Sequence, residues 1–429
     1  MAASQNRGSG RKGHTATAPL VTRIARGACH APVREAVHVV WDARTDTEAQ
    51  MLREVAHQFA ERTLRSAGQH ADETGETPWQ AVRAAGQLGL SAPNVPEEYG
   101  GPGIRALTMS VVMEELGWGN FGIAATIGTA SLVAAALLFA GTEEQRRRYL
   151  PHLCSVDEPW VGALALTEPE SGSELEIALA GAPQNLATHA VRTQDGYVLR
   201  GAKRFITNGG MADLTLLLAR TEVGSGPDSW SLFLLEKGTK GLRAGRQIPT
   251  MGLRGSYTGE LFLDDCAVLQ EALLGAPGSG FATVMHVLQV ARTMISSAAV
   301  GLARASYEAA AAYSADRQQF GRPIREHQFV AGLLARMRVD IDAARGLVQR
   351  AAQDLDAGRD VTLESAEAKL FAGEAAVRVT QDALQIHGGY GFTRELPLEM
   401  WVRDAFISRI FFGTSEVQML EIAQQIARV

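Results

Sequence analysis

The pattern of apolar residues changes twice along the chain, and this constrains the fold more than any other feature. From Thr47 to about Leu150, apolar residues recur with a period of about 3.6, which is typical of amphipathic helices. Between about 160 and 270, short apolar runs such as Leu214–Leu218 are separated by Gly, Asp or Asn, which predicts β-strands. After Gly280 the helical pattern returns. The order predicts helices, then strands, then helices.

We therefore expect an α+β protein of several domains. Residues 47–160 are predicted to form a helical domain, residues 161–275 a β domain built as an antiparallel barrel or sandwich, and residues 276–429 a helical bundle. Three Ala-rich segments are predicted as long antiparallel helices of that bundle: Ser296–Ala312, Ala331–Leu355 and Glu364–Ile386. Residues 1–46 are rich in Ser, Gly, Ala and basic residues, and we interpret them as a disordered or peripheral arm.

Composition excludes several functional classes. The 429 residues carry a formal net charge of −6 and are only 6 % aromatic, so neither a basic field nor a stacking platform for nucleic acid is expected. The chain has three cysteines, an odd number without CxxC spacing, which argues against a disulfide framework and a structural zinc site. We expect a protein of a reducing compartment, the cytoplasm, without a metal.

One stretch, from Phe121 to Thr142, contains no charged residue and is long enough to cross a membrane. It is rich in Ala and includes Thr, Ser and Gly, so its hydrophobicity per residue is modest. We predict a helix buried inside a helical bundle, and no membrane partner.

Familiar motifs of phosphate binding and hydrolysis are absent. The sequence has no GxxxxGK[ST], HExxH or GxSxG string. Its one GxGxxG match, at Gly8, Gly10 and Gly13, falls in the polar arm and does not join a predicted strand to a helix. We treat that match as chance.

Five short strings, called here the first to the fifth, instead gather hydroxyl, glycine and basic residues. They are Ala165–Ser173, Gly201–Asn208, Arg317–Gly321 with Gln328, Gln385–Phe392 and Phe412–Glu416. Arg317 is a fixed cation that can pair bidentately with a phosphate. Glycines in the fourth string allow close backbone approach to a ligand, and the fifth could open a helix whose N-terminal amides favour an anion. Each string alone could be a turn, a helix cap or a surface cation.

Together and in this order, the strings resemble the acyl-CoA dehydrogenase superfamily over roughly residues 47–429. The family's strings TEPGAGSD, KxxITN, RxxFG, QxxGGxG and GTS[EQ] are matched nearly in full. The resemblance implies a helical N-terminal domain, a central β domain and a C-terminal four-helix bundle. It also implies an FAD-dependent oxidoreductase that acts on an acyl thioester, on coenzyme A or a carrier protein, and forms a homodimer or homotetramer. It leaves the electron acceptor open.

The resemblance also assigns roles position by position, and it implies that the segment with Arg317, Phe320, Ile324 and Gln328 reaches the FAD of a neighbouring subunit. The positions that match the family's FAD contacts are Leu166, Thr167, Gly172, Ser173, Phe205, Thr207, Arg317, Phe320, Ile324, Gln328, Gln385, Gly388, Gly389, Thr414 and Glu416. The positions that match its thioester site are Ser173, Arg292 and Phe412. In the first string, Glu170 and Glu174 stand where the family has Gly and Asp.

The family's catalytic base is missing. Most members remove the thioester α-proton with a Glu immediately before the Gly-Thr-Ser string, where this chain has Phe412. A minority place that Glu just before the arginine matched by Arg292, where this chain has Ala291. Loss of a general base typically costs about 10²–10⁴ in rate. The main-chain N–H at residue 412, which the family uses to polarise the thioester carbonyl, does not depend on the side chain.

Three explanations stay open. The base could be relocated, with His286, Tyr257 and Glu395 as candidates. The reaction could instead need no such base, as in flavin-dependent oxygenation or oxidation after loss of CO₂. The protein could also bind flavin without catalysis, as a scaffold, and Phe412 could then simply fill the core.

Overall fold

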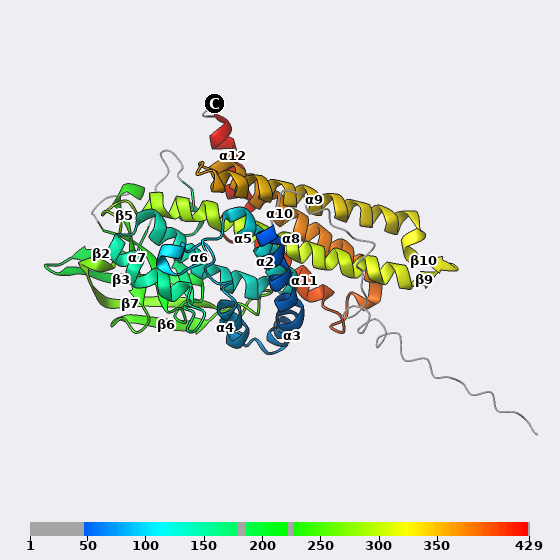
Figure 1. The fold of residues 1–429 in the computed structure, drawn as a ribbon, viewed down its shortest axis with the longest axis horizontal. Coiled ribbons are helices and arrows are strands. Elements are labelled where there is room, and N and C mark those ends of the chain that lie inside the picture. The colour runs from blue at the N-terminus through cyan, green and yellow to red at the C-terminus, as the bar shows by residue number, and fades with distance from the viewer. Residues whose placement is uncertain (1–46, 178–185, 222–225, 428–429) are drawn as a thin grey trace, which may run out of the picture.

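The computed structural model describes residues 47–177, 186–221 and 226–427 (Figure 1). The arm predicted at 1–46 lies outside these residues, so its interpretation stays a prediction. Within the described part, helices precede a β-sheet and further helices follow it, in the order that the sequence pattern predicts.

The N-terminal part is helical, and two of its helices, α6 and α7, begin with a side-chain cap. The Oδ1 atom of Asn120 accepts a hydrogen bond from the N–H of Ile123 (2.9 Å) and thereby caps α6. Thr142 and Gln145 form a reciprocal capping box at the start of α7. The helices of this part are α2 (Thr47–Phe59), α3 (Arg65–Thr74), α4 (Trp79–Gln87), α5 (Ala106–Gly119), α6 (Phe121–Ala140) and α7 (Glu143–Leu153).

Helix α6 is the neutral stretch of the sequence. By length and composition it is the one helix of the described residues that could cross a membrane, and 72 % of its most apolar window is buried inside the structure. It packs on α5, on α8 (Gly280–Asp316) and on strand β1 (Gly162–Ala165). A helix that is apolar on all sides is satisfied by such a position in the interior.

The central part is one eight-stranded sheet rather than a purely antiparallel barrel or sandwich. Its strand order is β6-β7-β3-β2-β4-β5-β8, and β1 pairs with β4 off this path. The β1–β4 and β2–β4 pairings are parallel, which corrects the expectation of an all-antiparallel domain. The strands after β1 are β2 (His189–Arg192), β3 (Gly196–Thr207), β4 (Leu214–Arg220), β5 (Trp230–Glu236), β6 (Leu242–Gln247), β7 (Thr258–Leu269) and β8 (Leu273–Leu274).

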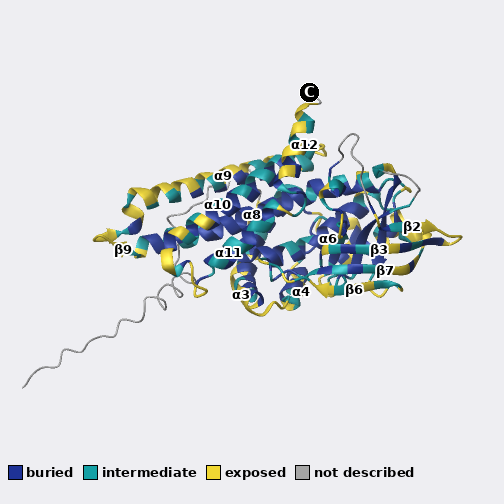
Figure 2. Cartoon of the chain, turned by 180° about the vertical axis from the view of Figure 1, so that it is seen from behind, coloured by how far each residue is buried: buried dark blue, intermediate teal, exposed yellow. Residues whose placement is uncertain are grey.

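Long helices dominate the C-terminal part. Helices α8, α9 (Gln328–Asp356) and α10 (Thr362–His387) pack against one another, and α12 (Ser415–Ala427) packs on α10. A short helix, α11 (Leu398–Ala405), lies between α10 and α12 in the chain. A small hairpin of β9 (Gln318–Gln319) and β10 (Arg322–Pro323) connects α8 to α9. In Figure 2 the inner faces of these helices are buried and their outer faces exposed.

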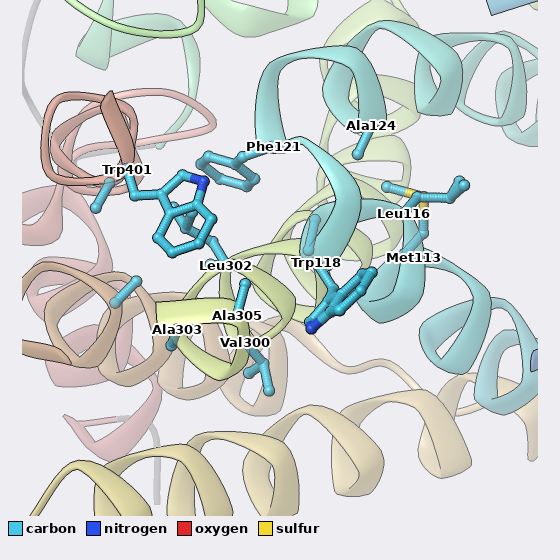
Figure 3. Packing of buried hydrophobic residues seen from close by; sticks show 14 of the residues in the cluster. Met113, Leu116, Trp118, Phe121, Ala124, Val300, Leu302, Ala303, Ala305 and Trp401 are labelled. Carbon is cyan, nitrogen blue, oxygen red and sulfur yellow. The ribbon is translucent and has the colours of Figure 1, made fainter. Parts of the chain in front are cut away.

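The N-terminal and C-terminal helices share one core. Side chains of α5, α6 and α8, among them Trp118, Phe121 and Leu302, meet in it (Figure 3). Helices α5 and α8 touch through their backbones: a Cβ at Gly301 would stand 2.0 Å from the carbonyl oxygen of Glu114. Only glycine permits this approach. The contact fixes α8 against the helices that precede the sheet.

Candidate active site

The first and second strings are bound together at the end of β1. The N–H of Arg204 donates to the carbonyl oxygen of Thr167 (2.9 Å), and the Nζ atom of Lys203 donates to that of Leu166 (2.7 Å). Leu166 is buried and Thr167 is partly exposed. The structure thus places these two predicted cofactor contacts beside β3, the strand that carries Phe205.

A buried ion pair holds this junction. Lys203 contacts Glu168 at 2.9 Å, and Glu168 also accepts hydrogen bonds from the N–H groups of Ala187 and Thr188. Burial lowers the pKa of Lys203 to about 8. Burial alone would raise the pKa of Glu168, but the Lys203 charge and the Thr188 N–H together lower it. Glu168 therefore stays ionised, and its ion pair with Lys203 stabilises this junction of the fold.

The ring of Phe205 is presented outside the sheet. The residue has a left-handed backbone (φ 59°), its side chain is 55 % exposed, and the Arg204 guanidinium lies 5.1 Å from the ring centroid. The cause is an irregularity in the β3–β7 pairing between Lys203 and Ile206. Thr207 follows in the last position of β3, and Ser173 is exposed. An exposed aromatic ring beside free hydroxyls suits a planar polar ligand.

Residue 412 has a fixed backbone and a half-buried side chain. Its φ is 52°, and its carbonyl oxygen accepts from the Nε atom of Arg292 (3.2 Å) and the Nε2 atom of Gln418 (3.1 Å). Its ring lies 5.1 Å from that of Phe411 and packs against two hydrophobic clusters. Phe412 thus contributes to packing, while its main-chain N–H donates no hydrogen bond within residues 47–177, 186–221 and 226–427.

Arg292 joins the first string to the fifth. It is fully buried on α8, and its Nη2 atom donates to the carbonyl oxygen of Glu176 (3.1 Å), three residues after Ser173. Its neighbour Ala291 is buried and places no carboxylate here. We call the grouping of the first, second and fifth strings around Arg292 the inner cluster.

Glu176 is the titratable residue of the inner cluster that the family strings did not reveal. Its Oε2 atom is buried without a hydrogen bond in the described part of the chain. Burial raises its pKa to about 7, against the opposing charges of Arg292 and Lys369. The only signal in the sequence was a third acidic residue after Glu170 and Glu174.

Thr414 and Glu416 stand at the start of α12. The Oγ1 atom of Thr414 accepts from the N–H of Val417 (3.2 Å), as an N-cap does. Glu416 is exposed, and hydrogen bonds from its own N–H and from Thr414 lower its pKa. Helix α12 therefore begins within the fifth string, where the sequence predicts the start of a helix.

The third and fourth strings form a separate site, the outer cluster, at the other end of the bundle. A cavity of about 480 Å³ is lined there by Arg317, Ile324, Gly388 and Gly389, with buried His387 stacked on Tyr313 at 4.3 Å. Phe320, Gln328 and Gln385 are exposed and do not line the cavity. No ion pair of the described residues involves Arg317, so its charge is available to an anion.

The two clusters cannot be one site within one chain. Arg292 lies in the first half of the 37-residue helix α8, and Arg317 follows its last residue. At about 1.5 Å per residue, the separation is on the order of 35 Å. In Figure 1 the β9–β10 hairpin lies at the opposite end of the molecule from the sheet. A single dinucleotide does not cover this distance.

The described contacts of the three candidate bases are with groups other than Phe412. Glu395 lines the outer cavity, so its candidacy within one chain was wrong. His286 stacks on Phe139 at 4.1 Å, and burial lowers its pKa. The ring centroid of Tyr257 lies 6.2 Å from that of Trp79. No described contact brings either side chain to Phe412.

Both clusters suit FAD. At the outer cluster, a Cβ built on Gly388 or Gly389 would meet no atom within 4 Å, so the backbone borders open space beside an unpaired guanidinium. Diphosphate oxygens fit such a place. At the inner cluster, the exposed Phe205 ring and the hydroxyls of Thr167 and Ser173 fit a flavin ring. No group of three or more His, Cys, Asp or Glu with metal-binding geometry occurs in the described ranges.

A helix–sheet–helix fold with a dinucleotide site divided in this way defines a flavin-dependent oxidoreductase. Family models for the N-terminal, middle and C-terminal domains of acyl-CoA dehydrogenase match residues 46–157, 163–266 and 278–427. The chain belongs to the acyl-CoA dehydrogenase family, whose members are FAD-dependent enzymes.

Close relatives cover nearly the whole chain. An acyl-CoA dehydrogenase of Bacillus subtilis is 38 % identical over 88 % of this chain and 97 % of its own, and a short-chain specific acyl-CoA dehydrogenase of Clostridium acetobutylicum is 38 % identical over 90 % and 100 %. The solved butyryl-CoA dehydrogenase of Megasphaera elsdenii superposes with a TM-score of 0.86 (34 % identity; 90 % and 100 % covered). The prolyl acyl carrier protein oxidase AnaB superposes with a TM-score of 0.82 at 30 % sequence identity. The match covers 89 % of this chain and 99 % of the oxidase chain.

Proposed function

We propose that the protein oxidises an acyl thioester at its α and β carbons, with Phe412 in the place of the family's usual base. The observation that carries this proposal is the main-chain N–H of Phe412, which has no hydrogen-bond partner among the described residues. A donor left free on a rigid, half-buried segment can polarise a thioester carbonyl. The main-chain N–H that would activate the thioester carbonyl is therefore present with a Phe side chain at position 412.

Residues of this chain would bind and orient the acyl thioester and the flavin ring. Arg292 and Gln418 fix the carbonyl oxygen of Phe412, and this sets the direction of the N–H on the same residue. The Phe412 ring, packed between two clusters, makes the wall beside that N–H apolar and excludes water. When bound, FAD would supply the acceptor for the β-hydride, which carries both electrons of the oxidation. Leu166, Thr167, Phe205 and Thr207 would hold its ring.

The acyl group could be carried on coenzyme A or on a carrier protein. Dehydrogenases named for CoA esters and an oxidase named for a prolyl carrier protein both share the fold at similar TM-scores. The departures of this chain, at residues 170, 174, 291 and 412, argue for a specialised substrate. We place its action in the cytoplasm.

The separation of the two clusters supports a shared cofactor. If the inner cluster of one copy holds the flavin ring, the outer cluster of a second copy can hold the diphosphate. Phe320 and Phe329 beside the outer cluster are 95 % and 92 % exposed, which suits surfaces that a second copy covers. We propose a homo-oligomer, a dimer or a tetramer.

Anaerobic mixing tests the function. The FAD-loaded protein should lose its visible flavin absorbance when mixed with butyryl-CoA or with prolyl carrier protein, but not with free butyrate or free proline. Retention of colour with every acyl-CoA and carrier thioester of a panel, together with oxygen uptake driven by a reductant, would contradict the proposal and favour an oxygenase.

A further inference from the structure

Glu176 lies against the backbone of the residue that follows Phe412. It comes directly after the short helix Ser173–Leu175, and a Cβ built on Gly413 would stand 3.2 Å from its Oε2 atom. Gly413 has φ 89°, a conformation that glycine adopts without strain. The carboxylate thus reaches the fifth string from the first, one residue from the position where the family places its base.

One buried guanidinium fixes both positions. Arg292 donates through Nε to the carbonyl oxygen of Phe412 (3.2 Å) and through Nη2 to the carbonyl oxygen of Glu176 (3.1 Å). The backbones at 176 and 412 are therefore bound to the same rigid plane. A carboxylate at 176 has a defined place relative to the free N–H at 412.

Arg292 and the neighbouring Glu176 each carry one buried polar atom that has no partner in the described part of the chain. They are the Oε2 atom of Glu176 and the Nη1 atom of Arg292. Leaving such an atom unpaired costs about 1–3 kcal/mol, and more when it is charged. Unpaired buried groups of opposite charge are expected where a polar ligand completes the site.

The surrounding charges keep this carboxyl group near its titration point at neutral pH. Burial raises its pKa to about 7, while Arg292 on α8 and Lys369 on α10 oppose the rise. The other acidic groups around these two cations are Glu374 on α10 and Glu416 and Glu421 on α12. A general base works best with a pKa near the working pH.

We propose that Glu176 is the relocated catalytic base, which takes the α-proton of the acyl thioester. This inference rests on the proposed function. In the step, the Cα–H bond breaks and its proton passes to the Glu176 carboxylate. The electron pair left on Cα forms the Cα=Cβ double bond as the Cβ–H bond breaks and a hydride leaves for the oxidised FAD. The products are an α,β-unsaturated thioester, reduced FAD and a protonated Glu176.

Exchange of the α-proton isolates the base from the oxidation. The probe is 3-thiabutyryl-CoA, which has acidic α-protons but no β-hydrogen to give up, incubated with the FAD-loaded full-length protein in deuterated buffer. Mass spectrometry measures deuterium at the α-carbon. We expect exchange by the wild type to rise through about pH 7 and then level, and Glu176→Gln to slow it by about 10²–10⁴-fold.

Two further variants separate catalysis from folding. Glu176→Asp keeps a carboxylate and should restore part of the exchange. Glu158→Gln removes an exposed carboxylate just before β1, outside the five strings, and should leave the rate within about threefold of the wild type. Exchange by a folded Glu176→Gln within threefold of the wild type, or a wild type that binds the analogue without exchanging it, overturns the inference. A wild type that binds neither FAD nor the analogue contradicts the proposed function itself.

Discussion

The carboxylate of Glu176 lies beside Gly413: a Cβ built at 413 would stand 3.2 Å from Oε2. This contact joins the loop after β1 to the start of α12, two parts of the chain that the family uses for the cofactor and for the base. In our proposal, Phe412 stands in place of the family's carboxylate and Glu176 supplies one within reach of the same position.

The first prediction concerns stability as a function of pH. The folded pKa of Glu176, about 7, is above its ordinary value of 4.5. Between these values the folded state binds more protons than the unfolded state, so this residue lowers stability as pH rises. The free energy of unfolding of Glu176→Gln should equal that of the wild type near pH 4.5. Above about pH 7.5 it should be larger than that of the wild type by about 1–3 kcal/mol. Thermal unfolding at several pH values measures the difference. A variant less stable than the wild type at high pH would contradict the assignment of a raised pKa.

The second prediction restores the family's base. Phe412→Glu alone should leave thioester oxidation within about tenfold of the wild type, because Glu176 already supplies a carboxylate for the step. The same change should rescue Glu176→Gln, since either carboxylate suffices. Stopped-flow reduction of the flavin measures both. A Phe412→Glu protein that binds FAD and thioester and stays inert would show that the thioester lies elsewhere.

The third prediction concerns the outer cluster. Arg317→Ala should weaken FAD binding about 10–100-fold, the loss of a charge-assisted bond to a phosphate. Exposed Arg325, next to Ile324, is the matched control, and Arg325→Ala should change the affinity by less than about threefold. Flavin fluorescence during titration of the FAD-free protein gives the dissociation constants. Equal effects of the two variants would mean that general charge, rather than this cavity, binds the cofactor.

The fourth prediction tests the joint between α5 and α8. Gly301→Ala puts a methyl group 2.0 Å from the carbonyl oxygen of Glu114, and the required backbone shift should cost about 1–3 kcal/mol. Gly346→Ala on α9 meets no atom within 4 Å and should stabilise the protein by about 0.5–1 kcal/mol. Melting temperatures of the two variants should therefore move in opposite directions.

The sequence predicted the order of helices and strands well, because long Ala-rich helices and short Gly-bounded strands leave different patterns. It also named the residues that meet at the inner cluster, since the strings carry them. It did not reveal Glu176, whose importance arises from contact with Gly413 and Arg292, far away in the sequence. The resemblance implied that Arg317 reaches the FAD of a neighbouring subunit, and the helical periodicity alone did not give the separation of Arg317 from Phe412 within one chain.

The parallel pairing of β1 with β4 was also not predicted. Apolar runs give the positions of strands, but their neighbours are decided by long-range packing, here of β1 against α6. Residues of the outer cluster, such as Phe320 and Gln328, show a related limit. The proposed homo-oligomer would account for their exposure in one chain, since a second copy would then supply the rest of the site.

The composition of the product tests the central claim most directly. The FAD-loaded protein is mixed anaerobically with butyryl-CoA or prolyl carrier protein, and the thioester is then analysed by mass spectrometry. We predict loss of two hydrogens from the acyl group, with one molecule of unsaturated thioester formed for each FAD reduced. An acyl group recovered unchanged from every thioester of the panel, or one that gains oxygen when air is admitted, would contradict dehydrogenation at this site.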